Sequence, residues 1–321
     1  MSESDLPTSP ARKADSSDDW QRRVIDTFAW EVLREQRRAR RWGIFFKLLG
    51  FGYLLALLIL YRPAGIGDGM MGNRHTALIE VRGVIADDSE ASADNIVTAL
   101  RAAFEERRAA AVILRINSPG GSPVQAGYVN DEIVRLREEY PEKKVYAVIT
   151  DICASGGYFI AAAADEIYAD KASVVGSIGV LMNGFGFVGS MEKLGVERRL
   201  LTAGENKDFM DPFSPLETRD LDHARALLKE IHQQFINTVK RGRGERLSED
   251  EELYSGLVWT GVQAVELGLV DALGSASFVA REIVKAEDLV DYTPRQPYLD
   301  RVAKRLGAVL AQSLTSHISL R

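Results

Sequence analysis

Ser155 is the residue of this sequence whose surroundings best suit a nucleophile. It follows a strand-like apolar run that ends at Thr150 and precedes a helix-like run of small residues that begins at Gly157. At such a junction the N–H groups of the helix point outward, and glycine neighbours leave room for a reacting group. A serine at this place also suits a plain helix N-cap, because its hydroxyl accepts from the first-turn N–H groups. This stretch alone leaves both interpretations open.

A second glycine-containing turn, residues 117–123, follows a strand-like run that ends at Ile116 and precedes a helix-like run. Its Gly120 and Gly121 let the backbone approach a ligand and leave N–H groups free. Free backbone N–H groups are what an oxyanion hole requires. An ordinary strand–turn–helix connection would have the same pattern, so the turn by itself does not decide between the two.

A nucleophilic serine needs a general base, and no histidine is an obvious one. We expect all four histidines at the surface: His75, His223, His232 and His317. A lysine can serve instead if burial lowers its pKa enough to leave the amine neutral. Lys207 is the candidate, because the aromatic residues that follow it could exclude water. The neighbouring Asp208 and Asp211 would work against this by raising its pKa.

The composition restricts the classes of function. The 321 residues carry a formal net charge of −6, which argues against nucleic acid as the main partner. The single cysteine, Cys153, can form neither an internal disulfide nor a cysteine zinc cluster, and we expect it to fill space beside Ser155. We expect neither a metal ion nor a cofactor.

The N-terminal part predicts a membrane anchor. We expect residues 1–42 to form a tail that is disordered at its start and basic at its end, with five arginines in 34–41. The following run, 44–61, contains one charge, Lys47, and is long enough to span the hydrocarbon core, so we predict a transmembrane segment over 43–62. A buried core helix is the alternative, but the run has no polar face. By the positive-inside rule, the basic block predicts that the N-terminus lies in the cytoplasm and that the chain from residue 62 onward lies outside.

After a glycine-rich linker, 63–74, strand-like and helix-like runs alternate, which predicts an α/β fold with a mostly parallel sheet. We predict a catalytic domain over 75–285 and a C-terminal tail over 286–321, with an amphipathic helix that docks in an oligomer. The predicted strands are 77–85, 112–116, 145–150, 166–169, 177–182 and 196–201. The predicted helices are 93–106, 124–139, 157–164, 190–194, 215–240 and 260–267.

Four motifs in this order resemble the signal peptide peptidase A family of membrane-anchored Ser/Lys proteases, peptidase family S49. The resemblance covers roughly residues 75–285 and is closer to the short bacterial form, which has one catalytic half. The motifs are Asn117–Ser122 (NSPGGS), Ala154–Tyr158 (ASGGY), Val175–Gly179 (VGSIG) and Gly204–Asp208 (GENKD), the last followed by Asp211-Pro-Phe.

The resemblance implies a crotonase-like or Clp-protease-like α/β superhelix. It implies that Ser155 is the nucleophile and Lys207 the general base. The oxyanion donors would be Gly121, or Gly120 if the alignment shifts by one, together with Gly156. The resemblance also implies a ring-shaped homo-oligomer, in which the serine and the lysine of one site can come from neighbouring protomers.

Ser177 lies in the third motif, and we expect it to help orient the lysine. The expected function is a serine endopeptidase of the bacterial inner membrane, with its N-terminus in the cytoplasm and its catalytic domain outside. Its substrates would be remnant signal peptides and other apolar peptides near the membrane. Two alternatives stay open: a crotonase-like acyl-thioester enzyme, which an extracytoplasmic location disfavours, and a non-catalytic scaffold that binds membrane peptides.

Overall fold

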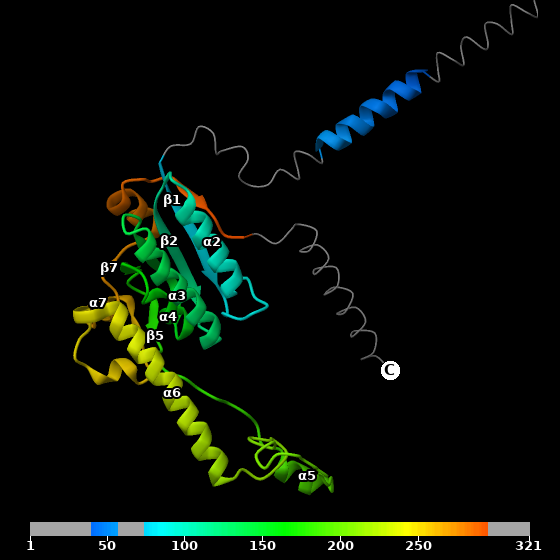
Figure 1. The fold of residues 1–321 in the computed structure, drawn as a ribbon, viewed down its shortest axis with the longest axis vertical. Coiled ribbons are helices and arrows are strands. Elements are labelled where there is room, and N and C mark those ends of the chain that lie inside the picture. Colours follow the sequence, from blue (N-terminus) through cyan, green and yellow to red (C-terminus); the bar gives the residue numbers. More distant parts are fainter. Residues whose placement is uncertain (1–39, 57–73, 295–321) are drawn as a thin grey trace, which may run out of the picture. The chain divides into compact units, whose positions relative to one another are not determined.

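The computed structural model describes residues 40–56 and 74–294 (Figure 1). The chain divides into two compact units, Met1–Gly72 and Asn73–Arg321, and each is described by itself. The predicted disordered start of the tail, nearly all of the predicted linker and the predicted C-terminal amphipathic helix lie outside the described residues.

In the first unit, residues 40–56 are helical and expose large apolar side chains such as Phe45 and Leu48. Among the residues that the structure describes, no helix is both long enough and apolar enough to cross a membrane. Residues 57–61, which complete the predicted apolar span, lie outside that part. The transmembrane anchor stays a prediction.

The second unit is built on an eight-stranded sheet of mostly parallel strands. Its main order is β6-β5-β3-β2-β1-β8, and β4 pairs with both β3 and β7. Every pairing is parallel except β5 with β6, so the predicted parallel α/β fold is confirmed. The strands are β1(His75–Arg82), β2(Ala109–Ser118), β3(Val145–Ala154), β4(Glu166–Ala169), β5(Val174–Gly176), β6(Val258–Thr260), β7(Ala272–Leu273) and β8(Leu289–Asp291).

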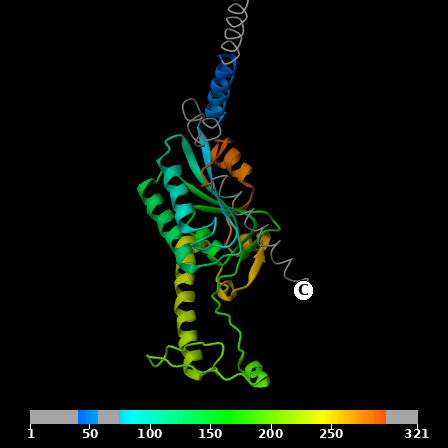
Figure 2. The same cartoon turned by 90° about the vertical axis from the view of Figure 1, so that its right-hand side faces the viewer.

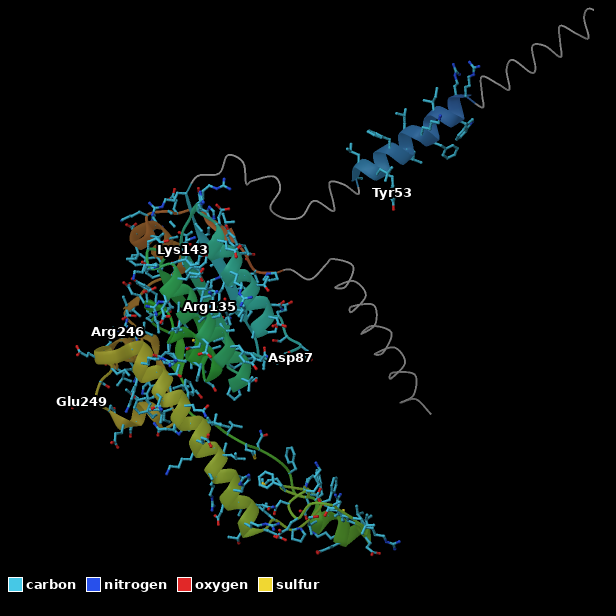
Figure 3. All side chains as sticks on the ribbon, viewed as in Figure 1. Tyr53, Asp87, Arg135, Lys143, Arg246 and Glu249 are labelled. Carbon is cyan, nitrogen blue, oxygen red and sulfur yellow. The ribbon has the colours of Figure 1, made fainter. Side chains whose placement is uncertain are left out.

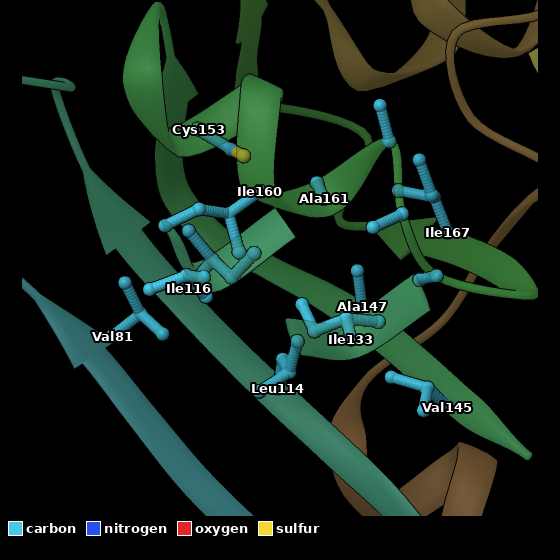
Figure 4. Packing of buried hydrophobic residues seen from close by; sticks show 14 of the residues in the cluster. Val81, Leu114, Ile116, Ile133, Val145, Ala147, Cys153, Ile160, Ala161 and Ile167 are labelled. Carbon is cyan, nitrogen blue, oxygen red and sulfur yellow. The ribbon is translucent and has the colours of Figure 1, made fainter. Parts of the chain in front are cut away.

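Helices cover both faces of this sheet to different extents. α2 and α3 pack on one face, and their apolar side chains form one core with alternate residues of the central strands (Figure 4). A smaller core on the other face lies under α8 and η3. The helices are α2(Ala93–Glu105), α3(Pro123–Glu139), α4(Gly156–Ala161), α5(Val188–Leu194), α6(Thr218–Arg243), α7(Gly261–Glu266) and α8(Ala276–Phe278), with short turns η1(Gly244–Arg246), η2(Glu251–Tyr254) and the π-helical η3(Val279–Val284).

Side-chain contacts stabilise the start of α3 and the end of α2, the two long helices that cover the sheet. Ser122 caps α3 by accepting from the Gln125 N–H, and Pro123 occupies the first turn, where its missing N–H does no harm. At the end of α2, the buried Lys143 amine (labelled in Figure 3) donates to the carbonyls of Ala103, Phe104 and Glu106. A cation at this position also complements the negative end of the helix dipole.

Two predicted strands, 177–182 and 196–201, are not strands in the structure. The first prediction is wrong because β5 ends at Gly176: Ser177 turns with a φ of 52°, and its N–H donates to the Leu257 carbonyl. The second is wrong because residues 196–201 pair with no strand among residues 74–294, and Leu201 is 98% exposed. In addition, β8 pairs with β1, so the sheet includes residues that the sequence had placed in the C-terminal tail.

The residues between β5 and α6 form a separate feature, which we call the arm and define as residues 180–217. It contains α5, and both views place it at the end of α6 that lies away from the sheet (Figures 1 and 2). Several of its large apolar side chains are exposed: Leu181, Met182, Phe185, Phe187, Leu194, Val196, Leu200, Leu201, Phe213 and Leu216.

Candidate active site

Three of the four sequence motifs follow neighbouring parallel strands. β2 pairs with β3, and the end of β3 pairs with β5. Because the carboxyl ends of parallel strands meet at one edge of a sheet, the turns after these strands lie together. The register shows this directly, since Ser118 is opposite Cys153 and Ala154 is opposite Gly176. The sheet therefore brings the glycine turn, Ser155 and Ser177 to one place.

Ser155 sits between β3 and α4 in a strained backbone conformation. Its φ is 52° and its ψ is −123°, a region of backbone conformation that residues other than glycine rarely occupy. Its N–H donates to the Gly176 carbonyl at 2.9 Å, and its side chain makes no capping hydrogen bond to α4. The structure therefore does not support the N-cap interpretation. The hydroxyl is half-buried and available for chemistry.

Gly120 packs directly against the serine turn. A Cβ at Gly120 would lie 2.7 Å from the Ser155 Cβ and 2.8 Å from the Gly156 nitrogen, so no other residue fits here without displacing the serine. Its φ of 102° also belongs to the region that favours glycine. The glycine is needed because the two backbones touch, which explains one of the two glycines in the turn.

Gly121 forms a bridge with Ile85, in which Ile85 donates to the Gly120 carbonyl and Ser122 donates to the Ile85 carbonyl. In a parallel bridge of this kind the N–H of the central residue points to the opposite side. On that side lies Gly156, where a Cβ would be 3.3 Å from the Gly121 nitrogen. Within the described part of the chain, neither the Gly121 N–H nor the Gly156 N–H has a hydrogen-bond acceptor.

This arrangement can perform one kind of chemistry well. An oxyanion hole needs two unpaired N–H donors close to the nucleophile and fixed before the reaction begins. Gly121 and Gly156 supply two such N–H groups beside Ser155, each on a backbone that packing holds in place.

Lys207 lies apart from these residues. It is exposed, in a turn of the arm where its N–H donates to the Gly204 carbonyl at 3.2 Å. The described residues show no contact between Lys207 and either Ser155 or Ser177. The expected exclusion of water is also not found in this chain, since Lys207 is exposed and the nearby Phe213 is 39% exposed. One chain by itself does not assemble the predicted pair.

Sequence reasoning missed Ser118. It is fully buried, and its hydroxyl accepts from the Gly120 N–H at 3.1 Å, which fixes the glycine turn. The signal was available, because Ser-Pro-Gly is a turn sequence in which the serine hydroxyl commonly bonds to the backbone two residues on. Cys153, in contrast, is buried as expected, and burial raises the pKa of its thiol.

The surface prediction for the histidines is wrong for two of them. His75 is buried, because it begins β1 and lies under Tyr292, whose hydroxyl is 3.0 Å from its Nε2. His232 is half-buried, with its Nε2 3.0 Å from the Ile178 carbonyl oxygen. The sequence contained a signal for His232, since it shares a helix face with Phe235 and Val239 of the core. His223 is exposed, and His317 lies outside the described residues.

Comparisons with known proteins point to one family. Residues 137–290 match the model of peptidase family S49. The chain is 35% identical over 199 residues to the putative protease slr0021 of Synechocystis, a match that covers 62% of this chain and 69% of that protein. It is 31% identical over 230 residues to a putative signal peptide peptidase SppA of Enterococcus faecium, covering 69% of this chain and 66% of that protein.

A third relative is a Brucella melitensis protein named Na(+)/H(+) antiporter NhaA, 44% identical over 209 residues. That match covers 65% of this chain but only 28% of the relative, so this chain corresponds to less than a third of it. The family model and the names of two of these relatives, a putative protease and a putative signal peptide peptidase, agree on a peptidase family. The chain belongs to peptidase family S49.

Proposed function

We propose that this protein is a serine endopeptidase with a Ser/Lys dyad, in which Ser155 is the nucleophile and Lys207 the general base. The observation that carries the proposal is the strained turn at Ser155: its hydroxyl lies beside two backbone N–H groups, and none of the three has a hydrogen-bond partner among the residues that the structure describes. Membership of a peptidase family supports the reaction class. The match of the GENKD motif supports Lys207 as the base.

In the proposed reaction, the neutral Lys207 amine takes the proton of the Ser155 hydroxyl as the serine oxygen attacks a peptide carbonyl carbon. The carbonyl oxygen becomes an oxyanion and accepts from the Gly121 and Gly156 N–H groups. The C–N bond breaks, and the leaving amine takes the proton back from Lys207. A water that Lys207 then deprotonates attacks the acyl-enzyme, releasing the new carboxyl end and restoring the Ser155 hydroxyl.

We also propose that the dyad forms between chains of a homo-oligomeric ring, with Lys207 of one protomer meeting Ser155 of a neighbour. Support comes from the arm, which carries Lys207 away from the sheet and exposes apolar side chains that a neighbouring protomer could cover. Contact with a neighbour would remove water from Lys207, which a lysine base requires. Ser177, beside Ser155, would then help to orient the incoming amine.

For substrate and location, we propose remnant signal peptides and other apolar peptides near the bacterial inner membrane. The apolar run 44–61 supports a single-pass anchor with the N-terminus in the cytoplasm and the catalytic domain outside. The name of the Enterococcus faecium relative, a putative signal peptide peptidase, supports the substrate class. An anchor would hold the site close to the bilayer, where such peptides collect.

The experiment compares the full-length wild type with Ser155→Ala and Lys207→Ala on an unstructured apolar peptide. We expect each variant to lose more than about 10³-fold in kcat, because both residues act in the same step. Lys193→Ala, an exposed lysine of the same arm, is the matched control and should keep wild-type turnover. A serine-reactive phosphonate should label the wild type but not Ser155→Ala.

Full turnover in either dyad variant would overturn the proposal. Two other outcomes identify the alternatives. Peptide binding without cleavage or labelling would indicate a non-catalytic scaffold, and turnover of an acyl-thioester without peptide cleavage would indicate a crotonase-like enzyme.

A further inference from the structure

α6 connects the arm to the elements that hold the serine turn. It is 26 residues long, and its second half packs on α4, the helix that begins immediately after Ser155. Between the two helices, the ring centroids of Phe235 and Phe159 lie 5.1 Å apart. At Gly242 the backbones are in direct contact, because a Cβ there would overlap the Ala162 carbonyl oxygen. The position of α6 against α4 is therefore closely defined.

The C-terminal end of α6 is also held by a buried ion pair. The Arg243 guanidinium, 1% exposed, donates to both carboxylate oxygens of Asp271 at 2.7 and 2.9 Å. Arg246, just beyond the helix (labelled in Figure 3), approaches the same carboxylate at 3.3 Å. Paired geometry of this kind fixes orientation as well as distance. A side chain on the inner face of α6 is thus presented to the core from a rigid support.

His232 is such a side chain, one turn before Phe235. Its Nε2 lies 3.0 Å from the carbonyl oxygen of Ile178, a residue with no exposed surface. A carbonyl oxygen only accepts, so Nε2 carries the proton and donates. The nitrogen is committed to this hydrogen bond, which leaves His232 as a support of the backbone rather than a base for Ser155.

The backbone that His232 holds leads directly to the nucleophile. Ile178 follows Ser177, which has a φ of 52° and whose N–H donates to the Leu257 carbonyl at 2.7 Å. The preceding residue, Gly176, accepts the Ser155 N–H at 2.9 Å. Two residues with positive φ, Ser177 and Ser155, are thus joined through one carbonyl group. Such conformations persist only where surrounding contacts over-determine them.

We propose that His232 is a positioning residue: by holding the Ile178 carbonyl it keeps the Ser177 turn strained and the Gly176 carbonyl in place, which orients Ser155 for attack. The effect on catalysis rests on the proposed peptidase function. The effect on the Ser155 amide does not, and can be measured without any substrate. Nothing in this role requires His232 to touch the substrate, so it affects the chemical step and leaves peptide binding unchanged.

The test uses full-length protein with His232→Leu, which removes the hydrogen-bond donor and replaces the imidazole with an apolar side chain of similar bulk. We expect kcat to fall about tenfold with KM within about twofold of wild type, and phosphonate labelling of Ser155 to slow by a similar factor. Amide hydrogen exchange in the peptide that contains Ser155 should become faster, because its acceptor is no longer held.

His232→Gln should restore most of the activity and the slow exchange, because the glutamine amide can donate from nearly the same place. Gln234→Leu, which puts leucine on the exposed side of the same helix, is the matched control and should behave as wild type.

Wild-type kcat, labelling and exchange in His232→Leu would overturn the inference. So would a folded His232→Gln that is as slow as His232→Leu, since that would show that the imidazole packs and does not act through its donor. Failure of the proposed function has a different signature: Ser155→Ala would retain turnover, or the wild type would show none. In that case faster exchange at Ser155 in His232→Leu alone would still support the structural link, and its absence would reject it.

Discussion

At the scale of single residues, the site depends on close contacts between backbones. Gly120 lies where any side chain would meet the Ser155 Cβ and the Gly156 nitrogen. The hydroxyl of Ser118 holds the same turn from inside the core. Ser155 itself keeps a positive φ, which is unfavourable and must be compensated by these neighbours. The geometry of the proposed nucleophile is therefore set by residues to which no chemical step is assigned.

We predict that Gly120→Ala abolishes peptide cleavage and destabilises the protein by about 1–3 kcal/mol, because the new methyl group displaces the serine turn and the residue has a φ of 102°. The measurements are kcat and urea unfolding. The control is Gly127→Ala, within α3, where a Cβ meets nothing within 4 Å. That change should leave cleavage unaltered and stabilise the protein by about 0.5–1 kcal/mol. Normal cleavage by Gly120→Ala would contradict the close packing at this turn.

At the scale of elements, the two helices that cover the sheet are joined by charge as well as by apolar contact. Glu132 of α3 accepts from Arg101 of α2 at 2.7 Å and from Arg135 of its own helix at 2.8 Å. Hydrogen bonds from Arg135 and Arg101 lower the pKa of Glu132 from 4.5 to about 2. Because the folded pKa is depressed, the carboxylate stabilises the folded state above its unfolded pKa, and this contribution is lost as the pH falls toward 2.

We predict that Glu132→Gln lowers the free energy of unfolding at pH 7 by on the order of 1 kcal/mol, a reduced value because both arginines are half exposed. The difference from wild type should shrink between pH about 5 and 2, and urea unfolding over this range measures it. Glu138→Gln, an exposed position on the same helix, should show no such pH-dependent difference. A constant difference at every pH would show that Glu132 acts through packing instead.

At the scale of the whole molecule, the two proposed dyad residues lie on different parts of the chain. Ser155 follows the central strand β3, at the carboxyl ends of the parallel strands. Lys207 is a residue of the arm, which lies at the end of α6 that points away from the sheet (Figures 1 and 2). The arm's exposed apolar side chains, such as Phe185 and Leu201, suit burial against another copy. A dyad shared between protomers would tie activity to assembly.

We predict that mixing inactive Ser155→Ala and Lys207→Ala proteins, with exchange of subunits, restores cleavage. In a randomly mixed ring, about a quarter of the sites would combine an intact serine with an intact lysine from the neighbour. Turnover of the mixture is compared with each variant alone, and sedimentation confirms that mixed oligomers form. Mixed oligomers without any recovery would contradict a dyad formed between chains.

The sequence by itself determined the central strands and the residues of the serine turn. The runs at 112–116 and 145–150 are apolar except for Arg115 and Thr150, because both faces of these strands are largely buried, so their pattern is visible without a structure. Ser155 and the neighbouring glycines stood out for a similar reason, since tight turns restrict residue type. In contrast, the short β5, β6 and β8 have too few residues for a periodicity, and they exist only because a neighbouring strand pairs with them.

Only the tertiary structure decided which of these parts meet. The run 196–201 was predicted as a strand, but within the described part of the chain it pairs with no other strand and does not become one. His232 was expected at the surface, and it contacts Ile178, 54 residues earlier in the chain. Likewise, no local sequence pattern reveals that Lys207 lies apart from Ser155 within one chain. Residue patterns reflect local conformation and burial, whereas contacts between distant segments depend on how the whole chain packs.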